Sequence, residues 1–314
     1  MTEHRPLPQR DTLTPRVQRL LPLPVLEAGL ILAWSSGFIG ARFSIDYAPA
    51  FLAVVWRCVL ITLVLLPFVI ARVRKTPPRV LLINAGIGLL SMAGYLAGVI
   101  QGIALGVPAG LAALFADLLP LGTALLAAVV LGQRLAWSAW AGLLVGLFGV
   151  IVVTHGALAW GSAPVWAYGL PLLGMLSLAV ATLWQKRLHA RHTMDLLPTL
   201  WLQCLVAGIV FAVVQGMQGS LAPVPSAGFA ISVVWTALLS TLGGYGLYWL
   251  CLKRATATRV ASALYLSPPV TMVMAWALFD EPLSWLMALG MAVSALGIWM
   301  VVRSEASGQP GHAN

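Results

Sequence analysis

Two charged residues, Arg57 and Asp117, lie inside long apolar stretches of this sequence. A charge at the centre of a lipid bilayer is costly, so such a residue needs a partner or a function. Asp117 has two functional interpretations, an acid that takes up a coupling proton or a contact for the ammonium group of a substrate. The structural alternative is an Asp117–Arg57 ion pair that holds two helices together. The sequence leaves these alternatives open.

Further polar and aromatic residues are expected at the same depth in the membrane. Aromatic walls with a few polar groups suit neutral or zwitterionic organic solutes, especially solutes with apolar side chains. Together with Arg57 and Asp117, the predicted substrate-binding residues are Trp34, Ser35, Tyr95, Gln101, Trp184, Tyr245, Tyr248, Tyr265 and Ser267.

Motifs for enzymatic chemistry are weak. His189 and His192 are three residues apart in a basic segment, where a solvated histidine is the better interpretation than a metal ligand. There is no glycine-rich phosphate loop, no nucleophile–base pair and no zinc spacing in the sequence. We therefore predict that the protein is not an enzyme and has no metal or cofactor.

The composition indicates which element type must position the candidate residues. Of 314 residues, 60% are hydrophobic and 9% are charged, whereas soluble domains carry roughly 25% charged residues. So few charges cannot cover a water-facing surface, so the protein must contact lipid. The net charge of +9 is better explained by membrane topology than by nucleic-acid binding, and no nucleic-acid partner is predicted.

Ten apolar segments are long enough to cross a membrane, which takes about 20 helical residues for a roughly 30 Å hydrocarbon layer. The prediction is an all-α polytopic protein of the inner (plasma) membrane with short loops and antiparallel neighbouring helices. The predicted spans are 25–45, 49–71, 79–104, 106–131, 136–154, 166–187, 195–217, 227–252, 256–279 and 283–302.

The cationic residues predict the orientation of these spans. In this arrangement 16 of the 18 Lys and Arg residues fall on the side that carries both termini, and only Arg42 falls on the opposite side. Because cytoplasmic loops are enriched in Lys and Arg, both termini are predicted to be cytoplasmic. The segments 1–24 and 304–314 are predicted to be cytoplasmic tails.

The sequence also contains an internal repeat. A shift of 148 residues pairs Pro120 with Pro268 and Trp137 with Trp285, and a shift of 150 pairs Gly94-Tyr95 with Gly244-Tyr245. The repeats span residues 25–154 and 166–303, joined by an external linker, 155–165. With five helices each, the second repeat is inverted relative to the first. Inverted repeats are typical of secondary transporters, whose substrate site lies near the midplane between the repeats.

Two groups of residues in these spans affect helix packing. Glycines recur in the third, fifth and tenth spans at spacings that let helix backbones approach closely, either within the chain or between the subunits of a homodimer. Pro120, Pro268 and Pro269 lie midway along the fourth and ninth spans, where proline interrupts helical hydrogen bonding. These prolines are predicted to be hinges; a fixed kink is the alternative. The small-residue positions are Gly94, Gly98, Gly102, Gly106, Gly142, Gly146, Gly149, Gly290, Ser294 and Gly297.

Three sequence features carry a resemblance to a known family. These are Leu32-Ala-Trp-Ser-Ser-Gly-Phe38, Arg57 in the second span, and the segments from Pro120 to Leu135 and from Pro268 to Leu283. They resemble the EamA branch of the drug/metabolite transporter superfamily over residues 25–303. One departure is that the glutamate ending the family's signature is kept as Glu281 but is Gln133 in the first repeat, so a role needing two symmetric carboxylates is in doubt.

The resemblance implies a ten-helix secondary exporter, with alternating access around a central cavity. The implied substrates are neutral or aromatic amino acids or related metabolites, with drugs or amines of the same superfamily as the alternative. An intramembrane enzyme and a passive channel are less favoured hypotheses. The substrate, the coupling to protons, the oligomeric state and the prevailing conformation are not determined by the sequence.

Overall fold

The computed structural model describes residues 21–308, except for 133–134, 159–162, 189–191 and 256. Most of the predicted tails, Gln133 and His189 lie outside these residues. The described residues form helices and no strand. In the first half the helices are α2 (Leu23–Ser44), α3 (Ala50–Lys75), α4 (Pro78–Gly88), η1 (Leu89–Gly94), α5 (Tyr95–Ala104), α6 (Ala109–Asp117), α7 (Leu119–Leu131) and α8 (Trp137–Leu158).

The second half repeats this order. Its helices are η2 (Val165–Tyr168), α9 (Gly169–Lys186), α10 (Leu196–Gln218), α11 (Ala227–Val234), η4 (Trp235–Gly243), α12 (Gly244–Leu252), α13 (Ala257–Leu264), α14 (Ser267–Phe279) and α15 (Trp285–Gly308). Helix α15 thus continues beyond residue 303, so the start of the predicted C-terminal tail is helical.

Many of these helices begin at prolines. Proline is tolerated in the first helical turn because its missing N–H would have no partner there. Pro78 opens α4, and α3 and α6 follow Pro49 and Pro108 directly. Helices α7 and α14 end in a left-handed residue, Gly132 with φ of 63° and Asp280 with φ of 53°.

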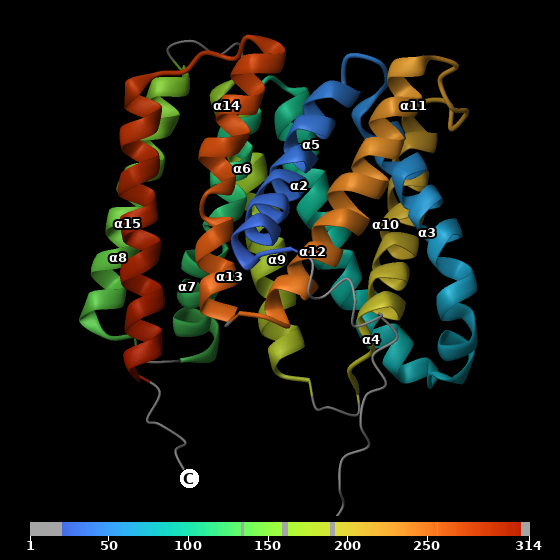
Figure 1. The fold of residues 1–314 in the computed structure, drawn as a ribbon, viewed down its shortest axis with the longest axis horizontal. Coiled ribbons are helices and arrows are strands. Elements are labelled where there is room, and N and C mark those ends of the chain that lie inside the picture. Colours follow the sequence, from blue (N-terminus) through green and yellow to red (C-terminus); the bar gives the residue numbers. More distant parts are fainter. Residues whose placement is uncertain (1–20, 133–134, 159–162, 189–191, 256, 309–314) are drawn as a thin grey trace, which may run out of the picture.

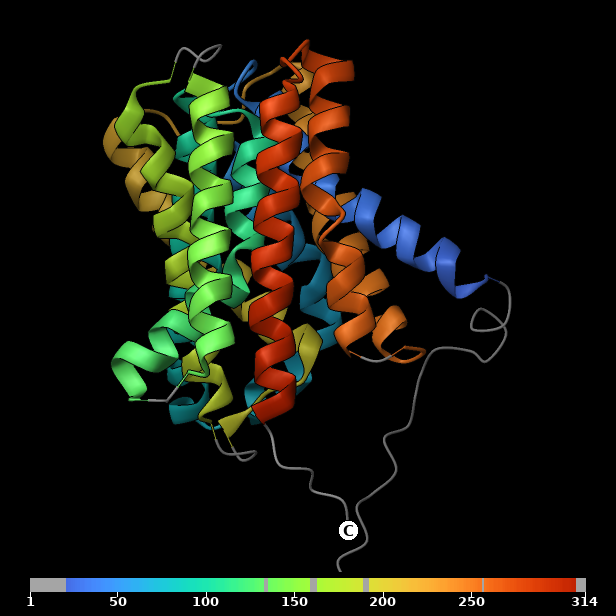
Figure 2. The same cartoon turned by 90° about the vertical axis from the view of Figure 1, so that its left-hand side faces the viewer.

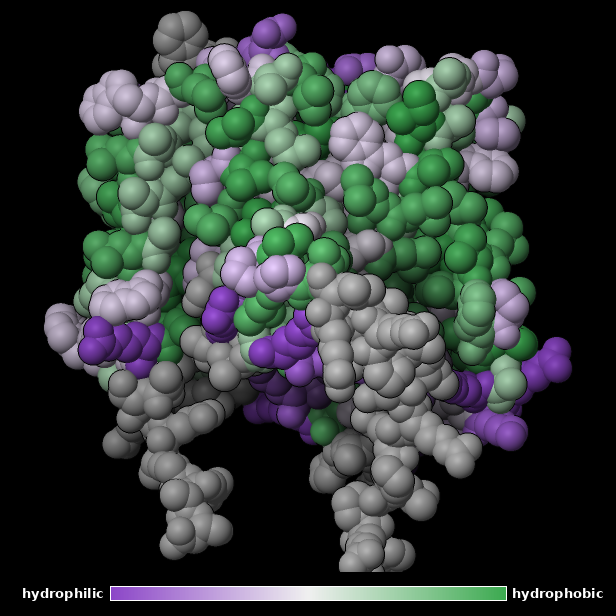
Figure 3. All heavy atoms as spheres, viewed as in Figure 1, coloured by the Kyte–Doolittle hydropathy of each residue, from purple (hydrophilic) through white to green (hydrophobic). Residues whose placement is uncertain are grey.

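The number of membrane-crossing helices is partly resolved. Among the described residues, eight helices are long and apolar enough to cross a membrane, and nine if the bent pair α6–α7 is one span. Helix α14 is apolar but shorter, and it lies end to end with α13 (Figure 1). Hydrophobic side chains cover the middle of the molecule, and strongly hydrophilic ones gather at one end (Figure 3). We call this end, where α3, α9, α12 and α15 finish, the basic end.

The two halves run in opposite directions. A shift of 148 residues carries α7 onto α14 and the start of α8 onto the start of α15. Equivalent helices α8 and α15 lie side by side (Figure 2). They are antiparallel, because Gly142 faces Gly297 and Met300 whereas Gly156 faces Leu286. This geometry is that of an inverted repeat.

The small residues lie at close contacts between helices, as predicted, with one exception. Gly98 lies against Gly174 and Leu170 of α9, and Gly149 lies against Gly290 and Ser294 of α15. The contacts therefore join helices within one chain. The exception is Gly106, which follows α5 with a φ of 96°. It belongs to a turn and not to the helix face.

Candidate functional site

Breaks in two helices position the central polar residues. Helix α6 ends at Asp117, one residue before α7, and the two axes differ by 41°. Pro120 and Pro268 lie in the first turns of α7 and α14. Since proline has no N–H to donate, the hydrogen bonding of the preceding helix stops there. The prolines therefore begin new helices; hinge motion about them stays a prediction.

Asp117 has an unusual environment for a carboxylate. Its Oδ2 atom is buried and has no hydrogen-bonding partner within the part of the chain that the structure describes. It is also the last residue of α6, two residues before the start of α7, so opposite dipole ends of two helices meet beside it. A cation would be the partner that an ionised carboxylate lacks here.

Arg57 is held by the opposite repeat. Its Nε and Nη2 atoms donate to the Oγ1 atom of Thr241 at 3.1 and 2.7 Å. The Thr241 hydroxyl is buried and donates in turn to the carbonyl of Thr236 at 2.8 Å. Arg57 thus bonds Thr241 and does not form the ion pair with Asp117 that was one alternative. Thr241 was not among the predicted binding residues.

Tyr95 and Tyr245 occupy equivalent places in the two repeats. Each follows a π-helical segment: η1 ends directly before Tyr95, and η4 ends with a single residue, Gly244, between it and Tyr245. Such segments are rare and frequently occur at functional sites. Tyr95 lies within electrostatic range of Asp117, Tyr245 and Arg57. These four residues, with Thr241, are called the central cluster below.

Aromatic rings border the central cluster. The ring of Trp34 on α2 lies 6.0 Å from that of Tyr245 and 6.4 Å from that of Tyr248, centroid to centroid. Trp34, Tyr95 and Tyr245 all pack against the same apolar core, which includes Ala116 beside Asp117. Tyr95 and Tyr245 therefore lie near the charged residues, and Trp34 lies next to Tyr245.

The remaining predicted residues are placed differently. Ser35 Oγ donates to the carbonyl of Ser267 at 3.2 Å, and both serines are fully buried, so they tie α2 to α14. Trp184 is 39% exposed and packs against Gly86 of α4. Gln101 is half-buried, nearly two turns beyond Tyr95 on α5. Tyr265 lies between α13 and α14 and packs against a second core around Leu111.

A second polar group lies at the end opposite the basic end. Glu281, just after α14, accepts the backbone N–H of Ala109 at the start of α6, at 3.0 Å. Arg42 at the end of α2 lies 3.8 Å from Glu281 and 4.9 Å above the ring of Phe279. Burial raises the pKa of Glu281, while the Ala109 N–H and Arg42 oppose the rise. We call this group the Glu281 clasp.

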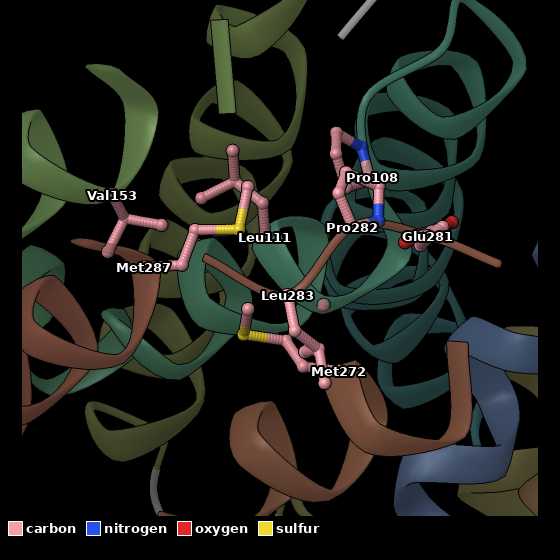
Figure 4. Close-up of a pocket in the computed structure, with 9 residues that line it drawn as sticks. Pro108, Leu111, Val153, Met272, Glu281, Pro282, Leu283 and Met287 are labelled. Carbon is pink, nitrogen blue, oxygen red and sulfur yellow. The ribbon is translucent and has the colours of Figure 1, made fainter. Parts of the chain in front are cut away.

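A small apolar cavity lies beside the Glu281 clasp (Figure 4). Its volume of ≈ 10 Å³ is close to that of a single water site. Pro108, Leu111, Met272 and Met287 line it together with Glu281. The cavity is too small for a metabolite, so it is not a substrate site.

Comparisons with known proteins agree with this architecture. The model of the EamA-like transporter family matches residues 25–155 and 165–303. An uncharacterized inner membrane transporter, YedA of Escherichia coli (strain K12), is 28% identical over 286 residues, covering 90% of this chain and 91% of its own. A crystal structure with 21% sequence identity superposes with a TM-score of 0.59 over 91% of this chain and 99% of that one, which supports the fold.

Two further relatives have more specific names. A probable amino-acid metabolite efflux pump of Escherichia coli (strain K12) is 27% identical, covering 88% of this chain and 94% of its own. A probable terminal-alkyne amino-acid exporter of Streptantibioticus cattleyicolor is 29% identical over 282 residues, covering 87% of this chain and 91% of its own.

Proposed function

Because this chain belongs to the EamA-like transporter family and is a multi-pass inner-membrane protein, we propose that it exports neutral or aromatic amino acids or closely related metabolites. The observation that supports the substrate class is the central cluster. It combines a cationic group, an unpaired carboxylate and aromatic rings between the two inverted repeats. The names of two relatives, which mention amino acids, point the same way.

The proposed topology has ten spans and cytoplasmic termini. The pair α13–α14 would form the ninth span, in the same way as α6–α7 forms a broken fourth one, and α15 would form the tenth. The basic end would face the cytoplasm because cytoplasmic loops are enriched in Lys and Arg. The Glu281 clasp would then close the external side.

The proposed mechanism is alternating access about the central cluster. Inverted repeats give two conformations of similar energy that expose one site to opposite sides. With the external side closed by the clasp, substrate would enter from the cytoplasm. The cytoplasmic side would then close and the external side would open, which releases the substrate outside.

Export of amines is a second candidate, favoured by one observation. The unpaired Asp117 carboxylate suits an ammonium group whether or not the solute has a carboxylate. Purified protein in liposomes, supplied in separate assays with labelled phenylalanine, threonine, methionine and phenethylamine, separates the two. We expect saturable flux of at least one of the three amino acids, and saturable flux of the amine only would transfer the assignment to amine export.

Coupling to protons needs a second experiment on the same liposomes. Flux with and without an imposed pH gradient, in the wild type and in Asp117→Asn, separates an antiporter from a facilitator. If Asp117 carries the coupling proton, the variant loses the response to the gradient. No saturable flux of any amino acid or amine would refute the proposed function.

A further inference from the structure

We propose that Arg57 and Asp117 bind the two ends of an α-amino-acid zwitterion, the carboxylate at Arg57 and the ammonium group at Asp117, with Thr241 as the residue that positions Arg57. This inference rests on the proposed function and makes its substrate class specific. A solute with both charges would bind better than a solute with either one.

The first step is the availability of Arg57. A guanidinium group has five N–H donors in a planar fork that matches a carboxylate. Thr241 accepts from Nε and Nη2, so donors remain for an anion. The titratable groups within electrostatic range of Arg57 include the phenols of Tyr95 and Tyr245 and the thiols of Cys58 and Cys204, and phenols and thiols are ordinarily neutral at neutral pH. Within the described residues Arg57 has no carboxylate partner, and an incoming carboxylate would supply this counter-ion.

The second step is the unpaired carboxylate. Asp117 has no ion-pair partner in the part of the chain that the structure describes. A buried carboxylate charge without a partner is costly. A solute ammonium group would relieve this cost.

The third step is the spatial relation of the two charges. Tyr95 lies within electrostatic range of both, so the two charged side chains lie in the same region of the protein. They are nevertheless not paired, because the Arg57 side chain is turned toward Thr241. In a zwitterion the two charged groups are a few ångströms apart. Such a solute can contact both side chains only if they are held separately, as here.

Thr241 makes this separation possible through local backbone geometry. It lies in η4, where the π-helical turn brings its hydroxyl to the carbonyl of Thr236, five residues earlier. The hydroxyl proton is therefore engaged, and the oxygen is free to accept from Arg57. A hydroxyl at this position fixes the direction of the guanidinium group.

The test compares three compounds that share one phenyl ring. Phenylalanine carries both charges, phenethylamine lacks the carboxylate and 3-phenylpropionate lacks the ammonium group. Competition against labelled phenylalanine flux in proteoliposomes gives their relative affinities. We expect the wild type to prefer phenylalanine over each analogue by about 10- to 100-fold, the range of one charge-assisted hydrogen bond.

The variants must change these preferences selectively. Arg57→Gln is expected to abolish the preference over phenethylamine and to keep that over 3-phenylpropionate, and Asp117→Asn is expected to do the reverse. Thr241→Val should weaken the preference for phenylalanine over phenethylamine severalfold. Thr241→Ser, which retains the hydroxyl, should keep this preference at the wild-type value. Matched controls are Arg72→Gln and Asp195→Asn, exposed residues at the basic end that should change neither ratio.

The outcomes are distinguishable. Saturable phenylalanine flux with the same analogue ratios in every variant would overturn the zwitterion assignment and leave amino-acid export standing. If Asp117→Asn removes the response to a pH gradient but keeps both ratios, Asp117 is a coupling acid and the assignment of the ammonium site is wrong. Absence of any phenylalanine flux in the wild type would overturn both proposals.

Discussion

Glu281 and Ala109 are 172 residues apart in sequence, yet the Glu281 carboxylate caps the backbone N–H of Ala109 at 3.0 Å. The bond joins the end of α14 in the second repeat to the start of α6 in the first. A shift of 148 residues pairs Ala109 with Ala257 and Glu281 with Gln133. The repeat therefore has a carboxylate at this position in its second copy and a neutral amide in its first.

Removing the cap should loosen the closed end. Loss of a helix N-cap costs about 1 kcal/mol, so Glu281→Ala should increase opening roughly fivefold. The measurement is the rate at which a thiol reagent modifies a cysteine placed at Met272, which lines the small cavity, in protein without other cysteines. Asp280→Asn, at the exposed neighbouring position, is the control. Equal rates in Glu281→Ala and the control would show that the clasp does not close this end.

The raised pKa of Glu281 predicts the pH dependence of the same opening. In the closed state burial holds this pKa above 4.5, and opening to water returns it toward 4.5. The closed state therefore binds the proton more tightly, and protonation stabilises it. Opening should be hardest below pH 4.5 and become easier as the pH rises through the raised pKa.

Labelling of the Met272→Cys protein at several pH values checks this dependence. The modification rate at each pH should be divided by the rate for the Met272→Cys protein that also carries Glu281→Gln. This second protein has no titrating group at position 281. This removes the pH dependence of the thiol chemistry itself. A ratio that falls with rising pH would contradict the assigned sign.

The packing of α5 against α9 depends on the absence of a side chain at Gly98. A Cβ there would lie 2.8 Å from Gly174 Cα and still closer to the carbonyl of Leu170. Because these are backbone atoms, they cannot move aside cheaply, and Gly98→Ala should cost about 1–3 kcal/mol. Thermal unfolding in detergent measures this loss, and Gly246→Ala, with no atom within 4 Å, is the control. Equal Tm values for the two variants would contradict the packing assignment.

The proposed orientation makes a prediction about accessibility from outside the cell. An impermeant thiol reagent added to intact cells should modify a cysteine at Ser220, in the loop after α10, and should not modify one at Arg74, at the end of α3. In permeabilised cells the reagent should modify both cysteines. Labelling of Arg74→Cys alone in intact cells would reverse the topology.

Much of the helical framework is predictable from sequence. The bounds of the long helices differ little from the predicted spans, because apolar length and proline positions are local properties of the chain. The repeat was visible for the same reason, since Pro120 and Pro268 open equivalent helices. The shift of 148 residues even carries α7 onto α14.

The contacts within the site were less predictable. Arg57 and Asp117 were identified because a charge in an apolar stretch is conspicuous, but whether they pair depends on Thr241, 184 residues from Arg57. The segments η1 and η4 have no pattern of their own, although the shared Gly-Tyr pair marks where η1 ends and η4 gives way to α12. Ser35 and Ser267 were expected to meet substrate, which stays a prediction, and the structure adds that their contact attaches α2 to α14.

The central claim, one solute site between the repeats that is reached from either side, is tested most directly by a cysteine at that site. The equivalent variants Tyr95→Cys and Tyr245→Cys, made in protein without Cys58, Cys204 and Cys251, are screened for retained phenylalanine flux. In oriented proteoliposomes, an impermeant thiol reagent should modify this cysteine when it is added on either side of the membrane. The phenylalanine concentration that protects the cysteine should be the same for both sides. Modification from only one side, or no protection by phenylalanine, would contradict the account.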